Sequence, residues 1–116
     1  MAEFKIFQVE RPWGNFRQFT HNSLSTVKIL TIKPNEQLSL QSHTKRSEFC
    51  RVIQGAGTMQ VGDIIYNIKE GDEYSVPVNV KHRITAGPTG LAYLEIDEGD
   101  FDENDIIRYE DKYGRA

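Results

Sequence analysis

Cysteine and long hydrophobic runs are what this sequence has least of. Its 116 residues include one cysteine, Cys50, so no disulfide can form within the chain, and a reducing, cytoplasmic setting is expected. The first fourteen residues, MAEFKIFQVERPWG, hold no uninterrupted apolar run, so no secretory signal is expected. No stretch approaches the ~20 apolar residues of a membrane span, and a membrane partner is therefore not expected.

Basic clusters with interleaved aromatic residues are also missing, which argues against a nucleic-acid partner. The net charge of −3 is unevenly distributed, because residues 95–105, EIDEGDFDEND, hold seven of the seventeen acidic residues and no basic one. The rest of the chain therefore has a basic excess that could attract an anionic small molecule. The alternative is a solvated acidic loop with ordinary surface charge elsewhere.

Short β-like runs separated by turn signals make up most of the chain. Residues 25–33 alternate, with Val27 and Ile29 on one face and Leu30 and Ile32 on the other. Further runs are expected at residues 38–43, 48–54, 58–61, 64–68, 74–77, 81–86 and 91–96, with turns at 34–37, 55–57, 62–63 and 70–73. A spacing of about 8 to 12 residues between turns is typical of an all-β sandwich or barrel, here expected as one domain over residues 1–116.

One short helix is predicted near the C-terminus. It begins near Asp102 and runs through Ile106, with acidic residues in its first turn, where they favour the positive end of the helix dipole.

Residues 41–48, QSHTKRSE, suggest part of a metal site. Side chains alternate along a strand, so Gln41, His43 and Lys45 share a side if the strand continues that far, and a bend could return Glu48 to it. His82 follows a turn-like segment at residues 77–80. Two imidazoles and a carboxylate suffice for a divalent metal, with a glutamine oxygen as a fourth ligand. On spacing alone, either histidine could instead be an ordinary core or surface residue.

Several motifs resemble one family. Residues 43–55, HTKRSEFCRVIQG, match the first cupin motif, and residues 71–86, GDEYSVPVNVKHRITA, match the second, with Asn79 where glycine is usual. RPWG at 11–14, LSLQSHTKRSE at 38–48 and NDIIRYEDKYGR at 104–115 resemble the mannose-6-phosphate isomerase cupins, including the C-terminal domain of bifunctional mannose-1-phosphate guanylyltransferases. The resemblance implies a conical jelly-roll β-barrel that interconverts mannose 6-phosphate and fructose 6-phosphate.

The resemblance also implies a ligand set. Isomerases of this type hold zinc through a glutamine, a histidine, a glutamate and a distant histidine, which correspond here to Gln41, His43, Glu48 and His82. Iron, manganese, nickel or cobalt are alternatives. Phe49 and Cys50 depart from the residues usual in the bifunctional enzymes. A thiolate at Cys50 could be a ligand, but Cys50 is expected to be a small buried apolar side chain.

Cationic residues are the candidates for catalysis and substrate binding. Lys45 is a candidate acid or base that replaces a ligand without loss of the site, or else a phosphate contact or a solvent-exposed side chain. Arg46 matches the family arginine after the ligands and is a second catalytic candidate, and Arg83 and Arg115 are substrate-binding candidates. Arg11 and Trp13 are expected to help close the barrel, with residues 108–115 as a clasp on that N-terminal motif.

Three functions compete at this point. The first is a metal-dependent sugar-phosphate isomerase, and the second is a non-haem iron oxygenase, since two histidines and a carboxylate also suit that chemistry. The third is a non-catalytic module that binds a sugar or a sugar nucleotide. A homodimer is expected in each case, because a conical barrel leaves edge strands that commonly pair.

Overall fold

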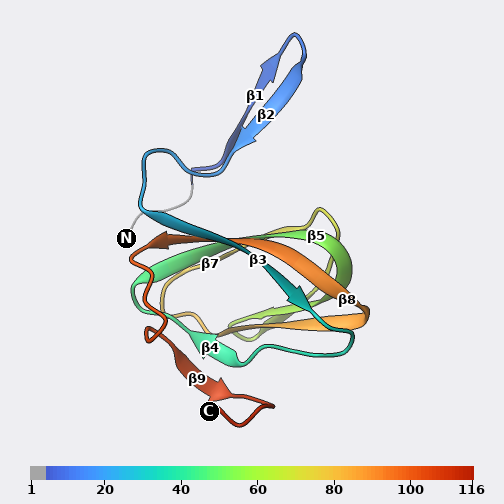
Figure 1. The fold of residues 1–116 in the computed structure, drawn as a ribbon, viewed down its shortest axis with the longest axis vertical. Coiled ribbons are helices and arrows are strands. Elements are labelled where there is room, and N and C mark those ends of the chain that lie inside the picture. Colours follow the sequence, from blue (N-terminus) through green and yellow to red (C-terminus); the bar gives the residue numbers. More distant parts are fainter. Residues whose placement is uncertain (1–4) are drawn as a thin grey trace.

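The computed structural model describes residues 5–116, and the regular structure in this range is entirely β (Figure 1). The strands are β1 (Phe7–Arg11), β2 (Gly14–Gln18), β3 (Ser25–Ile32), β4 (Leu40–Ser42), β5 (Arg46–Val61), β6 (Ile64–Lys69), β7 (Glu73–Val76), β8 (His82–Gly99) and β9 (Ile107–Glu110). In residues 5–116 there is no helix long and apolar enough to cross a membrane.

Two long antiparallel strands, β5 and β8, build both walls of the barrel. Residues 46–52 of β5 pair with 93–99 of β8, and residues 57–61 pair with 82–86. The first half is flanked by β7 and β3, and the second half by β6, β4 and β9. The strands curve so that the two halves face each other (Figure 1). This arrangement confirms the all-β jelly-roll barrel.

Glycines make the bend in β5 possible. Gly55 has a φ of +84°, and a Cβ there would lie 2.2 Å from the carbonyl oxygen of Gly90. A Cβ at Gly57 would lie 2.1 Å from the carbonyl oxygen of Thr85. The sequence pattern predicted a turn between two strands here. That prediction was wrong, because the glycines let one strand bend against its partner while pairing continues on both sides.

The barrel interior follows the predicted alternation of β3. Ile32 is buried and Leu30 packs against the core, whereas Val27 and Ile29 are 59% and 64% exposed on the outer face. The core cluster consists of Ile32, Cys50, Val52, Met59, Ile68, Val76, Ile84, Ala86, Leu91 and Tyr93. Cys50 is thus confirmed as a small core side chain, and burial raises the pKa of its thiol.

The predicted C-terminal helix is absent from residues 5–116. A single turn forms instead, in which the Asp105 N–H donates to the Asp102 carbonyl over 2.9 Å. The Asp105 carboxylate accepts the backbone N–H groups of Thr44 and Lys45, and Ile107 then pairs with β4. These contacts to the β4 end draw the chain into β9 before a second helical turn can form.

The N-terminal hairpin does not close the barrel, contrary to expectation. Strands β1 and β2 form a separate two-stranded sheet that projects from the barrel, with Trp13 at its tip 73% exposed (Figure 1). Two contacts link the base of the hairpin to the barrel. Arg17 forms an ion pair of 2.6 Å with Glu73, and the Phe19 ring, just after β2, packs on Phe49 with ring centres 5.2 Å apart.

The C-terminal residues also clasp a different partner from the one expected. Both Lys112 and Tyr113 contact the carboxylate of Glu36, and the Lys112 ion pair measures 2.9 Å. Strand β9 pairs with β4. The segment 108–115 therefore fastens to β4 and to the loop before it, and not to the N-terminal motif.

Candidate metal centre

Three predicted ligands converge inside the barrel. His43 follows β4, Glu48 lies on β5 and His82 begins β8, and each is buried. The His82 Nε2 atom lies 2.7 Å from Glu48 Oε1, and His43 Nε2 lies 3.8 Å from the same oxygen. One ligand atom from each residue falls within 4.8 Å of the other two. The bend between His43 and Glu48 therefore brings them together as the sequence predicted.

Backbone carbonyls fix which nitrogen of each histidine faces the centre. His43 Nδ1 lies 2.7 Å from the Asp105 carbonyl oxygen, and His82 Nδ1 lies 3.0 Å from that of Val80. A carbonyl can only accept, so both Nδ1 atoms donate, and in the neutral rings both Nε2 atoms carry a lone pair. This second hydrogen bond is the usual support of a metal-bound histidine.

His82 and Glu48 need a cation between them. Within residues 5–116, His82 Nε2 is buried and makes no well-aligned hydrogen bond, although a carboxylate oxygen lies 2.7 Å away. A lone pair facing a carboxylate is repulsive, so the contact needs either a proton on the ring or a metal ion. The donor set and this unsatisfied nitrogen fit a divalent metal.

The charge of Glu48 favours a proton on the His82 ring. Burial opposes charge on the His82 ring, but the close contact and charge of Glu48 outweigh it and raise the pKa of His82. Burial would likewise raise the pKa of Glu48, yet His82 and His43 lower it to about 2. Burial dominates at His43 and lowers the pKa of that ring. His43 is thus held neutral, as a ligand must be.

Gln41 lies beside these residues. Its backbone pairs with His82 on one side and with Arg108 on the other, and its Oε1 accepts a hydrogen bond from Ser39 Oγ over 3.1 Å. A carbonyl oxygen has two lone pairs, so one is left for a metal. Gln41 therefore remains a candidate fourth ligand.

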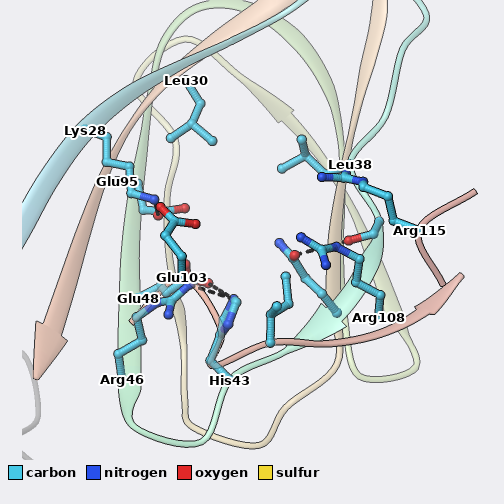
Figure 2. A pocket seen from close by; sticks show the side chains of 13 residues that line it. Lys28, Leu30, Leu38, His43, Arg46, Glu48, Glu95, Glu103, Arg108 and Arg115 are labelled. Atoms are coloured by element: carbon cyan, nitrogen blue, oxygen red, sulfur yellow. Dashed lines mark hydrogen bonds and ion pairs between the residues drawn. The ribbon is translucent and has the colours of Figure 1, made fainter. Parts of the chain in front are cut away.

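A cavity of about 220 Å³ opens next to the ligands. Its lining consists of Lys28, Leu30, Leu38, Ser39, Gln41, His43, Arg46, Glu48, Glu95, Glu103, Ile106, Arg108 and Arg115. In Figure 2, Lys28, Glu95 and Glu48 stand on one side, and Arg108 and Arg115 reach in from the other. The cavity combines a ligand cluster with separate cationic groups, as a site for a small anionic molecule would.

Lys45 is not brought to this cavity. Strand β4 ends at Ser42, so the alternation that would have turned Lys45 inward stops short. The Asp105 carboxylate accepts the Lys45 N–H over 2.9 Å, and the lysine side chain turns out, 57% exposed, with Nζ 3.8 Å from Asp102. The geometry fits the solvent-exposed alternative that the sequence left open.

Arg46, in contrast, is buried against the ligands. Its Nη2 lies 3.4 Å from His43 Nε2, and its Nε lies 3.4 Å from an oxygen of Asp97. The guanidinium also donates to the Asp102 carbonyl and lies 4.4 Å from the centre of the Phe101 ring. These contacts fix the position of Arg46 beside His43 and at the cavity wall.

The other two predicted arginines differ from each other. Arg83 donates to the Leu38 and Glu110 carbonyls over 3.1 and 3.2 Å and does not line the cavity. It links β8 to its neighbouring segments. Arg115 lines the cavity, and its Nε is held 2.9 Å from an oxygen of Asp111.

Sequence reasoning missed several cavity residues. Lys28 and Glu95 line it, with Lys28 Nζ 3.7 Å from Glu95 Oε2, and burial together with the Glu48 charge raises the pKa of Glu95 to about 9. Glu95, Asp97 and Glu98 are buried on β8, so a solvated loop is the wrong interpretation of these three acids. The alternation of β3 places Lys28 on the same inward face as Leu30 and Ile32, and this could have predicted its place in the cavity. Arg108 lies in the C-terminal motif at 104–115, but that motif was interpreted as a structural clasp and not as part of the cavity.

The architecture and this site define a cupin barrel with a candidate metal centre. A family model described as mannose-6-phosphate isomerase, C-terminal, matches residues 2–111, and the chain belongs to that family.

Relatives and solved structures agree with this assignment. The xanthan biosynthesis protein XanB of Xanthomonas campestris is 36% identical over 94% of this chain, and the mannose-1-phosphate guanylyltransferase of Salmonella montevideo is 33% identical over 93%. The chain spans about a quarter of the length of these relatives, 24% and 23%. The solved oxalate decarboxylase of Bacillus subtilis is 26% identical, with a TM-score of 0.69 over 75% of this chain and 24% of that one.

Proposed function

We propose that this chain is a metal-dependent sugar-phosphate isomerase that interconverts mannose 6-phosphate and fructose 6-phosphate. The observation that carries the proposal is the convergence of two imidazole Nε2 atoms on one buried carboxylate at the wall of a cavity. Membership of the mannose-6-phosphate isomerase C-terminal family supports the choice of reaction. The guanylyltransferase activity in the name of one relative describes a protein about four times as long.

His43, Glu48 and His82 would hold the metal, with Gln41 as a fourth ligand. Zinc suits two imidazoles and a carboxylate, and iron, manganese, nickel or cobalt suit them as well. When bound, the metal supplies Lewis-acid stabilisation of the negative charge that develops on the sugar oxygen.

An aldose–ketose isomerisation also needs a group that carries a proton between adjacent carbons. Glu95 is placed for this, because its carboxyl lines the cavity and is not one of the proposed ligands. Lys28, 3.7 Å from Glu95, holds that carboxyl in place. Arg46 positions His43 through their 3.4 Å contact. The earlier proposal of Lys45 as acid or base finds no support in its exposed position.

Turnover by the purified chain tests the proposal. The chain is stripped of metal, reloaded with zinc or manganese, and assayed against a panel of hexose 6-phosphates. We expect interconversion of mannose 6-phosphate and fructose 6-phosphate that a chelator abolishes. Binding of sugars without turnover would favour a non-catalytic module, and oxygen consumption with iron would identify an oxygenase.

We further propose that two copies of the chain associate. Strand β3 pairs with β8 alone among the described strands, so one edge is open, and the exposed Val27 and Ile29 make the outer face beside that edge apolar. The projecting hairpin exposes Trp13 and Phe7, and an isolated two-stranded hairpin is marginally stable in water. A second copy would cover both features. Sedimentation should show a dimer that Ile29→Asp weakens, and a concentration-independent monomer would contradict this.

The proposed compartment is the cytoplasm. Its support is chemical: the single cysteine is free and buried, and the fold uses no disulfide.

A further inference from the structure

Two arginines form the side of the cavity opposite Glu48 and Glu95 (Figure 2). We call Arg108 and Arg115 the arginine wall. We call the candidate ligand cluster of His43, Glu48 and His82 the ligand wall, of which His43 and Glu48 line the cavity. Arg108 lies on β9, and its backbone pairs with Gln41, which in turn pairs with His82. Arg108, Gln41 and His82 therefore form one row of paired residues across β9, β4 and β8. At ~4.8 Å between neighbouring strands, the backbones of Arg108 and His82 are about 10 Å apart.

Arg108 has no partner within the described chain. Its side chain makes no hydrogen bond or ion pair with any residue in 5–116, and its Nε is buried without an acceptor. A buried donor left unsatisfied is costly, and folded proteins rarely keep one without a reason. The other two arginines near β9 have partners. Arg83 donates to two backbone carbonyls, and Arg115 Nε donates to the Asp111 carboxylate.

We infer that the arginine wall binds the phosphate group of the substrate, with Arg108 as its principal contact. The inference rests on the proposed function, in that it names how a sugar phosphate is held. A guanidinium presents its N–H groups as a planar fork that matches phosphate oxygens, and bonds of this kind are among the stronger ones in proteins. The orphaned N–H of Arg108 would gain its acceptor when phosphate binds.

The charge pattern also sets the orientation of the substrate. The Glu48 carboxylate repels a phosphate at its end of the cavity, where Lys28 lies 3.7 Å from Glu95, whereas Arg108 and Arg115 attract one at the other end. The Glu103 carboxylate lines the same cavity, yet within residues 5–116 it makes no ion pair with either arginine. A sugar phosphate would therefore lie with its phosphate on the arginine wall and its reacting carbons at the ligand wall.

Calorimetric binding to the metal-free chain tests this site without relying on turnover. The probes are mannose 6-phosphate, mannose and sulfate, and the variants are Arg108→Ala and Arg108→Lys. Arg17→Ala is the matched control, because Arg17 is an arginine on the hairpin paired with Glu73, outside the cavity. Loss of a charged hydrogen-bonding group predicts that Arg108→Ala weakens mannose 6-phosphate binding by about 10- to 100-fold. Arg108→Lys should fall between it and the parent.

The inference is overturned if Arg108→Ala and Arg108→Lys bind mannose 6-phosphate and sulfate as the parent does, or if the parent does not prefer mannose 6-phosphate to mannose. Amide NMR spectra of each variant establish that it is folded, and zinc affinity should stay within about twofold of the parent because no proposed ligand has changed. Phosphate binding that depends on Arg108 in a chain without isomerase activity would support the site and refute the proposed reaction. Isomerase activity with an unchanged KM in Arg108→Ala would support the proposed reaction and refute the phosphate site.

Discussion

The ligand wall and the arginine wall differ in what holds their side chains. On the ligand wall, each histidine donates Nδ1–H to a backbone carbonyl, and Arg46 braces His43. On the arginine wall, the Arg108 side chain has no partner among the described residues, and Arg115 contacts Asp111. The first arrangement fixes ligand atoms in advance, as metal binding requires, and the second leaves a cation available for an anion. The cavity therefore keeps the candidate metal ligands and the proposed phosphate contact on opposite sides.

Glu48→Gln should give the largest effect, because it removes the charged ligand that both histidines face. Second-shell changes typically cost about 10- to 100-fold in metal affinity, so loss of a direct ligand should cost at least ~100-fold. Competition with a chromogenic chelator measures it, with Arg108→Ala and Lys45→Ala as controls expected to bind zinc normally. Equal zinc affinity in Glu48→Gln and Lys45→Ala would remove Glu48 from the ligand wall.

Lowering the pH should separate the two walls. The pKa of His82 is raised by Glu48, so below that pKa the ring carries a proton that the metal must displace. Apparent zinc affinity should therefore fall by up to about tenfold per pH unit below the His82 pKa and level off above it. Sulfate, which remains a dianion over this range, should bind the arginine wall with little change. A zinc affinity independent of pH between 5 and 8 would contradict the assignment of His82.

Arg83→Ala should destabilise the fold more than Arg108→Ala does. Arg83 donates two hydrogen bonds that link β8 to Leu38 and Glu110, and their loss should cost about 1 to 3 kcal/mol of unfolding free energy. Arg108→Ala removes a group without partners and should cost less than about 0.5 kcal/mol. Urea unfolding of both variants makes the comparison. A larger loss in Arg108→Ala would mean that this arginine supports the fold.

Lys45→Met should have the smallest effect. The side chain is exposed and reaches only Asp102, so metal affinity and hexose-phosphate turnover should both stay within about twofold of the parent. A steady-state assay beside zinc titration is sufficient. A drop of tenfold or more in kcat would restore Lys45 as a catalytic residue and require the 43–46 segment to rearrange when substrate binds.

Sequence periodicity predicted the strands well where one face of a strand is buried. The alternation in residues 25–33 indicated the inward face of β3, and the spacing of His43, Glu48 and His82 indicated residues that do converge. The positive φ of 64° at Asn79 explains why glycine is usual there and why asparagine, which tolerates this conformation, can replace it.

The failures share a physical cause, which is that long-range contacts override local pattern. In the sequence, Gly55 and Gly57 have the pattern of a turn between two strands. In the structure they are a bend within β5, which pairs with β8 on both sides and whose glycines lie against the carbonyls of Gly90 and Thr85. Lys45 points away because the Asp105 carboxylate, sixty residues later in the chain, accepts its backbone N–H. Arg108 is part of the C-terminal motif at 104–115, but its place in the cavity could not be predicted, since it depends on the pairing of β9 with β4.

Titration of the metal-stripped chain with zinc, followed by ¹⁵N NMR of the histidine rings, tests the central claim most directly. The chain has three histidines, and His21 lies on the surface with its ring against Gln18 and Asn22, outside the cavity. The account predicts saturation at one zinc per chain, with the Nε2 resonances of His43 and His82 shifted and those of His21 unchanged. No saturable binding, or a response confined to His21, would contradict the metal centre.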